Sequence, residues 1–176
     1  MGTHLKPQDV VVLLKLVAIG DRSWTYSELA KELGMSSSEV HAAISRAQTA
    51  RLYADVLHSV MHPNLLEFLI HGVRYVFPAE LGAPVRGIPT GHAAPPLNKH
   101  IVADEPLPPV WETAAGRVEG VSVSPLYRSV PDAALRDPAL YQLLACVDAL
   151  RIGRVRERQA ATDALRLRIM GQAEAA

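Results

Sequence analysis

Apolar positions recur every three to four residues over the first fifty residues of this 176-residue chain. This spacing is typical of helices that bury one face. It predicts three helices, the first beginning near Pro7, with inward-facing positions Val10, Leu13, Leu14 and Val17, then Leu29, Ala30 and Leu33, and finally Val40, Ile44 and Ala47. We expect these faces to form a tri-helical unit in which Ala30 is small enough to let two helices cross.

The second and third predicted helices both begin with a capping sequence. Thr25 is followed three residues later by Glu28, and Ser36 by Glu39. We therefore expect two capping boxes, in which each hydroxyl accepts from the glutamate N–H and each glutamate carboxylate accepts from the N–H of the capping residue. Gly34 lies between them, where a left-handed backbone is least costly for glycine. Two short helices joined by a glycine-containing turn are typical of the DNA-binding helix-turn-helix, and an ordinary packed helix pair is the alternative.

If the apolar stripe of the third helix faces inward, its polar side chains face outward. Small hydroxyls and free N–H groups at a helix start suit phosphate and base-edge contacts. We therefore predict a double-stranded-DNA-binding surface formed by Thr25, Ser36, Ser37, Ser38, His41, Ser45, Arg46 and Arg51. The cations expected on the same side are Lys15, Arg22, Lys31, Arg46 and Arg51.

The segment from about residue 5 to residue 57 resembles the winged helix-turn-helix regulators of the MarR-like kind, with SWTYSELAKELGMSSSEV as the helix–turn–helix core. The resemblance implies a β-hairpin wing after the third helix. Residues 53–61 can form two short strands, but they contain no Asn-Gly or Gly-Gly turn, so we expect a short wing. The whole-chain layout also resembles, by architecture alone, AbiE-type antitoxin regulators, which act beside a nucleotidyltransferase-like toxin.

The pattern changes beyond residue 62. Asn64 is expected to cap a short helix that ends at Gly72, and residues 73–77 are expected to form a strand stopped by a proline. Residues 82–109 are rich in glycine and proline and are predicted to be a long irregular connection. A second strand is expected over residues 118–123.

The last third of the chain is predicted to be helical. A short helix near residues 132–135 precedes a long one from Pro138 to about Met170, with Gly153 as the expected break. Its apolar face could cover the protein core or form a dimer. We assign residues 140–150 to the core and the part beyond the break, extended by Leu165 and Ile169, to a two-fold partner.

These elements define an α+β fold: an N-terminal winged helix-turn-helix, a small mixed middle segment and a long C-terminal helix. The predicted division is a DNA-binding domain over residues 1–62 and an α+β segment over residues 63–176. The second segment holds the Pro/Gly-rich loop and a C-terminal helical region for dimerisation or for docking a toxin-like protein partner.

Composition narrows the functional classes. The formal net charge is zero, which weakens any expectation of strong nonspecific nucleic-acid binding. No run of eighteen apolar residues and no signal-peptide pattern occurs, which predicts a cytoplasmic protein without membrane contact. Cys146 is the sole cysteine, so a disulfide framework and a cysteine-based zinc site are excluded, and a core position is expected.

No catalytic motif stands out, and we expect no enzyme, cofactor or metal. His58 and His62 are four residues apart but lack the H-E-x-x-H frame of a zinc protease. A small hydrolase built on the His92 loop is one rival interpretation. The main prediction is a sequence-specific transcriptional regulator, a repressor acting as a dimer. Its alternative is an antitoxin or protein-interaction module that uses the helix-turn-helix to bind a protein.

Overall fold

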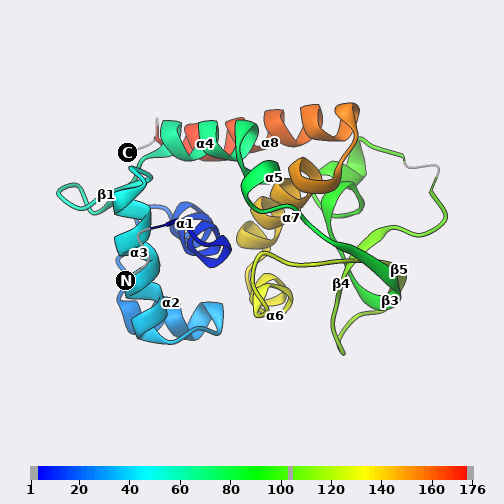
Figure 1. Ribbon diagram of the computed structural model, residues 1–176, viewed down its shortest axis with the longest axis horizontal. Coiled ribbons are helices and arrows are strands. Elements are labelled where there is room, and N and C mark those ends of the chain that lie inside the picture. Colours follow the sequence, from blue (N-terminus) through cyan, green and yellow to red (C-terminus); the bar gives the residue numbers. More distant parts are fainter. Residues whose placement is uncertain (1–3, 103–104, 174–176) are drawn as a thin grey trace.

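Three N-terminal helices pack against one another in the computed structural model, which describes residues 4–102 and 105–173 of this α+β protein. They are α1 (Pro7–Ile19), α2 (Tyr26–Leu33) and α3 (Ser37–Thr49), as the periodicity predicts. Residues 9–17 of α1 are all buried, because α1 packs against α3 on one side and α7 (Pro138–Ile152) on the other (Figure 1). This central helix therefore joins the N-terminal helices to the rest of the core.

A short hairpin follows α3, and the expectation of a reduced wing is confirmed. Strands β1 (Tyr53–Ala54) and β2 (Ser59–Val60) pair antiparallel over two residues each. His58 occupies the left-handed region in the turn, with φ of 48°, where the sequence offers no glycine.

The next segment is helical throughout, which corrects two expectations. Helix α4 (His62–His71) begins before Asn64, whose amide instead donates to the Arg51 carbonyl at 2.8 Å. The strand expected over residues 73–77 is wrong: α5 (Val73–Val76) continues the helical path, since the N–H groups of residues 75–77 bond back to the carbonyls of Gly72 and Val73. Tertiary packing overrides the strand preference of these β-branched and aromatic residues.

Three strands form a small sheet that closes on itself. Strand β3 (Leu81–Pro89) pairs antiparallel with both β4 (Pro109–Glu112) and β5 (Val118–Val123), while β4 and β5 pair parallel. The strand at residues 118–123 is thus confirmed. The irregular connection expected over residues 82–109 is wrong in its first part, which forms β3. Of the described residues, 90–102 and 105–108 are irregular, with short 3₁₀ turns η1 (Gly91–Ala93) and η2 (Leu97–Lys99).

Glycines in this region serve close strand packing rather than loop flexibility. A Cβ on Gly87 would lie 2.0 Å from the Trp111 carbonyl oxygen, and one on Gly120 would lie 2.1 Å from the Pro108 carbonyl oxygen. Only glycine lets three strands close so tightly.

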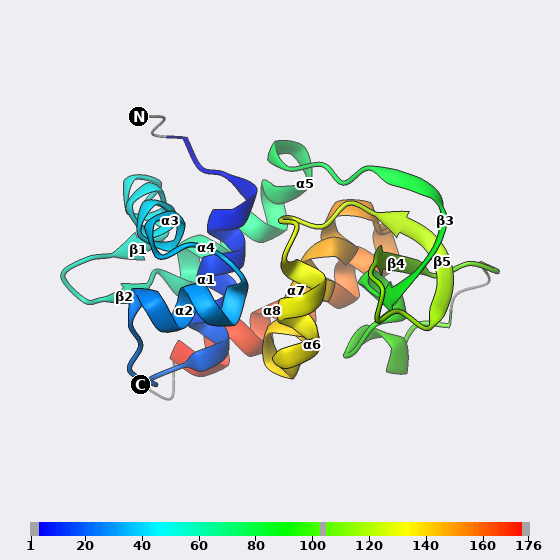
Figure 2. The ribbon, with the colours of Figure 1, turned by 90° about the horizontal axis from the view of Figure 1, so that it is seen from below.

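The C-terminal helices match the sequence prediction closely. They are α6 (Val130–Arg136), α7 and α8 (Val155–Ala173), with the break at Gly153 as expected. Figure 2 shows α7 between the N-terminal helices and the sheet. Residues 143–150 of α7 are buried without interruption, which confirms their assignment to the core.

The assignment of Leu165 and Ile169 to a dimer surface is wrong. Both side chains are fully buried within the single chain, because α8 packs along α4 and α7. Residues from both predicted segments belong to one hydrophobic cluster.

Candidate nucleic-acid interface

The two predicted capping sequences differ in the structure. The first is a complete capping box: the Thr25 hydroxyl accepts from the Glu28 N–H at 3.2 Å, and the Glu28 carboxylate accepts from the Thr25 N–H at 2.8 Å. In the second, Ser36 accepts from the Glu39 N–H at 3.1 Å, but the Glu39 carboxylate turns to Arg46 instead. Both caps fix where their helices begin.

The turn between α2 and α3 has the expected left-handed glycine. Gly34 has φ of 66° and ψ of 36°, and its N–H bonds to the Ala30 carbonyl. The turn is also anchored from outside, since Ser129, just before α6, donates to the Leu33 carbonyl at 2.6 Å. The C-terminal half therefore helps to hold the helix-turn-helix in place.

The outward face of α3 is exposed and polar. It consists of Ser37, Ser38, His41, Ser45 and Gln48. The imidazole of His41 lies beside the Tyr26 ring, with centroids 5.2 Å apart. Of the remaining predicted site residues, Thr25 and Ser36 are exposed caps, and Arg51 is exposed at the base of the hairpin. The structure therefore places seven of the eight predicted residues on accessible positions along α2, α3 and the hairpin base.

Arg46 is the exception, and its expected outward orientation is wrong. Its guanidinium donates to the two carboxylate oxygens of Asp9 at 2.8 and 2.6 Å and to Glu39 at 2.7 Å. Only 10% of the Arg46 side chain is exposed, and Asp9 is fully buried. The hydrogen bond with Asp9 raises the pKa of Arg46, and burial only partly opposes this effect. Arg46 therefore holds α3 to α1.

Most of the cations expected near DNA are already paired. Lys15 is 4% exposed, and its ammonium lies 2.6 Å from both Glu32 and Asp137. Arg22 pairs with Glu32 at 2.9 Å. Hydrogen bonding from Lys15 lowers the pKa of the Glu32 carboxyl, against the opposing effect of burial. Lys31 and Arg51 are exposed and form no ion pair within the described part of the chain.

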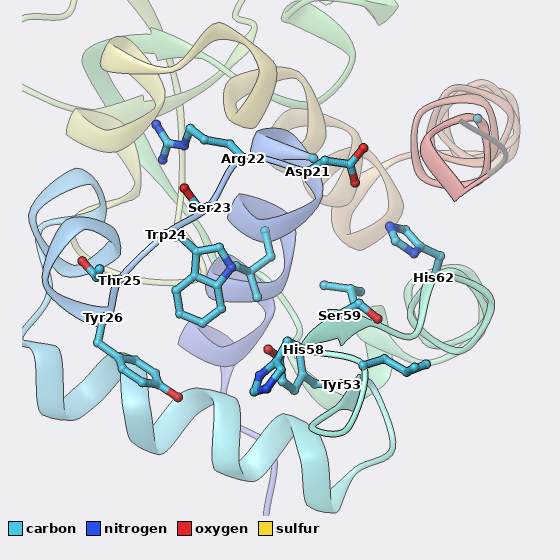
Figure 3. A pocket seen from close by; sticks show the side chains of 15 residues that line it. Asp21, Arg22, Ser23, Trp24, Thr25, Tyr26, Tyr53, His58, Ser59 and His62 are labelled. Carbon is cyan, nitrogen blue, oxygen red and sulfur yellow. The ribbon is translucent and has the colours of Figure 1, made fainter. Parts of the chain in front are cut away.

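A depression beside the helix-turn-helix is the feature that sequence reasoning missed. Figure 3 shows it between the α1–α2 loop, the hairpin, the start of α4 and the end of α8. Its walls include Trp24 and Tyr26, which lie at the start of α2, and Tyr53, which lies on the hairpin. The two aromatic residues on either side of Thr25 were a signal in the sequence for an aromatic site. No local pattern in the sequence indicates that Tyr53 lies near them.

The rival site at His92 is mostly buried. His92 is 6% exposed, its Nδ1 lies 3.6 Å from Glu157, and its Nε2 has no hydrogen-bond partner among the described residues.

Burial raises the pKa of the Cys146 thiol to about 12, as expected for a core position. Within the described ranges, His, Cys, Asp and Glu side chains do not gather in groups of three or more suited to a metal ion.

Residues 4–102 and 105–173 include no helix that combines the length and apolar character needed to cross a membrane. No known protein family, curated protein or solved structure matches the chain. The function must therefore be argued from the residues described above.

Proposed function

We propose that this protein is a sequence-specific DNA-binding transcriptional regulator that reads double-stranded DNA with α3. The observation that carries the proposal is the outward face of α3. Ser37, His41 and Ser45 are exposed there, while the opposite face of the helix is buried against α1 and α2. Hydroxyl and imidazole groups suit base edges in the major groove.

The charge distribution limits how such binding would work. Arg46 is held by Asp9, and of the five cations predicted on the DNA side only Lys31 and Arg51 are exposed without an ion pair in the described part of the chain. Each phosphate contact contributes about −0.9 to the slope of log affinity against log salt, so two contacts give roughly −2 per protomer. A two-fold dimer would double the footprint, which is why we retain the homodimeric repressor in the proposal.

The test is fluorescence anisotropy with a duplex spanning the region upstream of the protein's own gene. Replacing Ser37, His41 and Ser45 together by alanine should weaken binding at least about tenfold, since one lost base contact costs about 1–3 kcal/mol. A matched control removes two exposed polar side chains on α8, Gln159 and Asp163. Equal affinity of the triple variant and the parent for this duplex would contradict the proposal.

A second candidate is a protein-interaction module such as an antitoxin. It is favoured by the hairpin tip, where Val56 is 93% exposed and Leu57 is 71% exposed, and by the internal pairing of Lys15, Arg22 and Arg46. An apolar tip suits a protein surface better than a phosphate backbone. Two results together would favour this candidate. The protein would not bind the duplex even at low salt, and a protein partner that binds the parent would no longer bind when Val56 and Leu57 are changed to serine.

A further inference from the structure

The depression beside the helix-turn-helix is a cavity of about 1210 Å³. Small-molecule sites usually occupy roughly 300–1,000 Å³, so this one has room for a ligand with several rings. Its floor is apolar, because the side chains of Leu16, Tyr53 and Val60 are all buried there.

One end of the cavity is aromatic. The rings of Trp24 and Tyr26 meet edge to face, with centroids 5.5 Å apart and an interplanar angle of 85°. Tyr53 lies across from them on the hairpin (Figure 3). Burial raises the pKa of the Tyr53 phenol above its ordinary value. Such rings stack with planar ligands and attract cations to their faces.

The other end is polar and lacks an available positive charge. Asp21 is exposed and has neither a hydrogen bond nor an ion pair with any residue that the structure describes. Arg22, the lone Lys or Arg among the described lining residues, is held by Glu32 and points away from Asp21 in Figure 3. Burial lowers the pKa of His62, so its imidazole is neutral at neutral pH. The balance of charge favours a cation.

We propose that this cavity binds a small aromatic cation: a planar ring system bearing a protonated amine. The ring lies against Trp24 and Tyr26, and the ammonium group lies near the Asp21 carboxylate. An aromatic carboxylate would place its charge beside Asp21, where Arg22 is already held by Glu32, and is therefore rejected.

A second part of the inference rests on the proposed DNA-binding function. Tyr26 lines the cavity and also lies 5.2 Å from the His41 ring on the outward face of α3. A ligand held between the hairpin and the α1–α2 loop therefore contacts a side chain that touches the DNA-reading surface. Binding of the cation should change DNA affinity, and DNA should change cation affinity by the same factor.

The experiment compares two probes that share one ring and differ in charge, 1-naphthylmethylammonium and 1-naphthoate, on the full chain. Quenching of tryptophan fluorescence reports binding at Trp24, because the other tryptophan, Trp111, is 1% exposed. The ammonium probe should bind at least about fivefold more tightly than the carboxylate, because the ammonium forms an ion pair with Asp21 whereas the carboxylate meets a like charge there. Asp21→Asn should remove most of that preference, while Glu119→Gln, a change of an exposed carboxylate on β5, should not.

Two further variants test the aromatic end of the cavity while leaving the Trp24 reporter in place. Tyr26→Leu alters an exposed ring of the cavity, and Tyr75→Leu alters an exposed ring on α5 outside it. Only the first should weaken binding of the ammonium probe. Equal binding of the two probes, or an unchanged affinity in both Asp21→Asn and Tyr26→Leu, would overturn the cavity assignment.

Anisotropy with the upstream duplex, with and without the ammonium probe, separates the two proposals. A probe-dependent change in duplex affinity that disappears in Asp21→Asn supports the regulatory link. Probe binding with unchanged duplex affinity overturns the link and leaves the cavity assignment supported. Probe binding with no duplex affinity under any condition overturns the DNA-binding function itself, again without affecting the cavity assignment.

Discussion

Two buried aspartates, Asp9 and Asp148, are each held by an arginine among the described residues, but the two pairs connect different kinds of structure. In the N-terminal half, Asp9 of α1 accepts from Arg46 of α3, so the pair joins two helices. In the C-terminal half, Asp148 and Arg151 lie one turn apart on α7, with 2.7 Å between their charged atoms. The second pair therefore adds nothing to helix–helix contact by itself.

The hydrogen-bond partners of Asp148 and Arg151 show which segments this second pair holds together. Asp148 accepts from the Thr90 hydroxyl at 2.9 Å and the Trp111 indole at 2.7 Å. Arg151 donates to the carbonyls of Phe77 and Ser124, at 2.8 and 3.1 Å. Complete burial raises the pKa of the Asp148 carboxyl, and Arg151 opposes that effect. Helices satisfy their own backbone groups, whereas the irregular segments around the small sheet require side chains to do so.

The largest effect should come from Arg151→Met. The change leaves the Asp148 carboxyl buried without its cation and removes the donors for two backbone carbonyls. Removing one partner of a buried ion pair costs about 3–5 kcal/mol, and we expect the upper end here. Urea unfolding measures it. Arg156→Met, on the exposed side of α8, is the control and should change the unfolding free energy by less than about 0.5 kcal/mol. A similar small change for Arg151→Met would show that the network is dispensable.

Arg46→Met should destabilise the protein somewhat less, by about 3 kcal/mol, because Glu39 can turn to solvent while Asp9 cannot. The double variant Asp9→Leu/Arg46→Met should recover most of that loss, since it leaves no buried charge unpaired. No such simple rescue is expected at Asp148, where Thr90 and Trp111 would lose their acceptor. Additive losses in the double variant would contradict the proposed role of the pair.

Local signals in the sequence were sufficient for α1–α3 and for the break between α7 and α8, but not for α5, which was predicted to be a strand. The caps at Thr25 and Ser36, the turn at Gly34 and the break at Gly153 each act within a few residues and were predicted correctly, except that the Glu39 carboxylate turns to Arg46. The sheet was less predictable, because β3 depends on pairing with β5, more than thirty residues later. The glycines and prolines of β3 are more typical of a loop, so the sequence predicted an irregular connection there.

The candidate site was predictable in outline only. Helical periodicity placed Ser37, His41 and Ser45 outward, but it could not show that Arg46 bends toward Asp9 on another helix. Nothing in the periodicity distinguishes a long side chain that faces solvent from one that reaches inward. The cavity was missed for a similar reason, since its walls come from segments about thirty residues apart.

Ala30→Leu tests how tightly α2 packs against its neighbouring helices. Ala30 is 5% exposed, so the larger side chain must displace neighbours, and overpacking costs about 1–3 kcal/mol. Thermal melting measures the effect. Ala50→Leu adds the same group at an exposed position after α3 and should leave the melting temperature nearly unchanged. If both variants have the melting temperature of the parent, α2 does not pack tightly at Ala30, which would contradict the prediction.

The smallest effect concerns acid stability at the contact between the two halves, where Lys15 holds Glu32 and Asp137. Burial would raise the pKa of Asp137, but the Lys15 hydrogen bond and backbone donors bring it below its ordinary 3.8, and Lys15 chiefly lowers that of Glu32 below 4.5. Depressed carboxyl pKa values add stability that is present above the unfolded values and lost as pH falls through the folded ones.

In Lys15→Met, Glu32 and Asp137 stay partly buried without the cation, so both of their folded pKa values should rise. The drop in melting temperature between about pH 6 and about pH 3 should then be smaller than in the parent. Arg166→Met, at an exposed pair with Asp163, is the matched control and should keep the parental drop. An equal drop in the Lys15 variant would mean that this contact does not contribute to acid sensitivity.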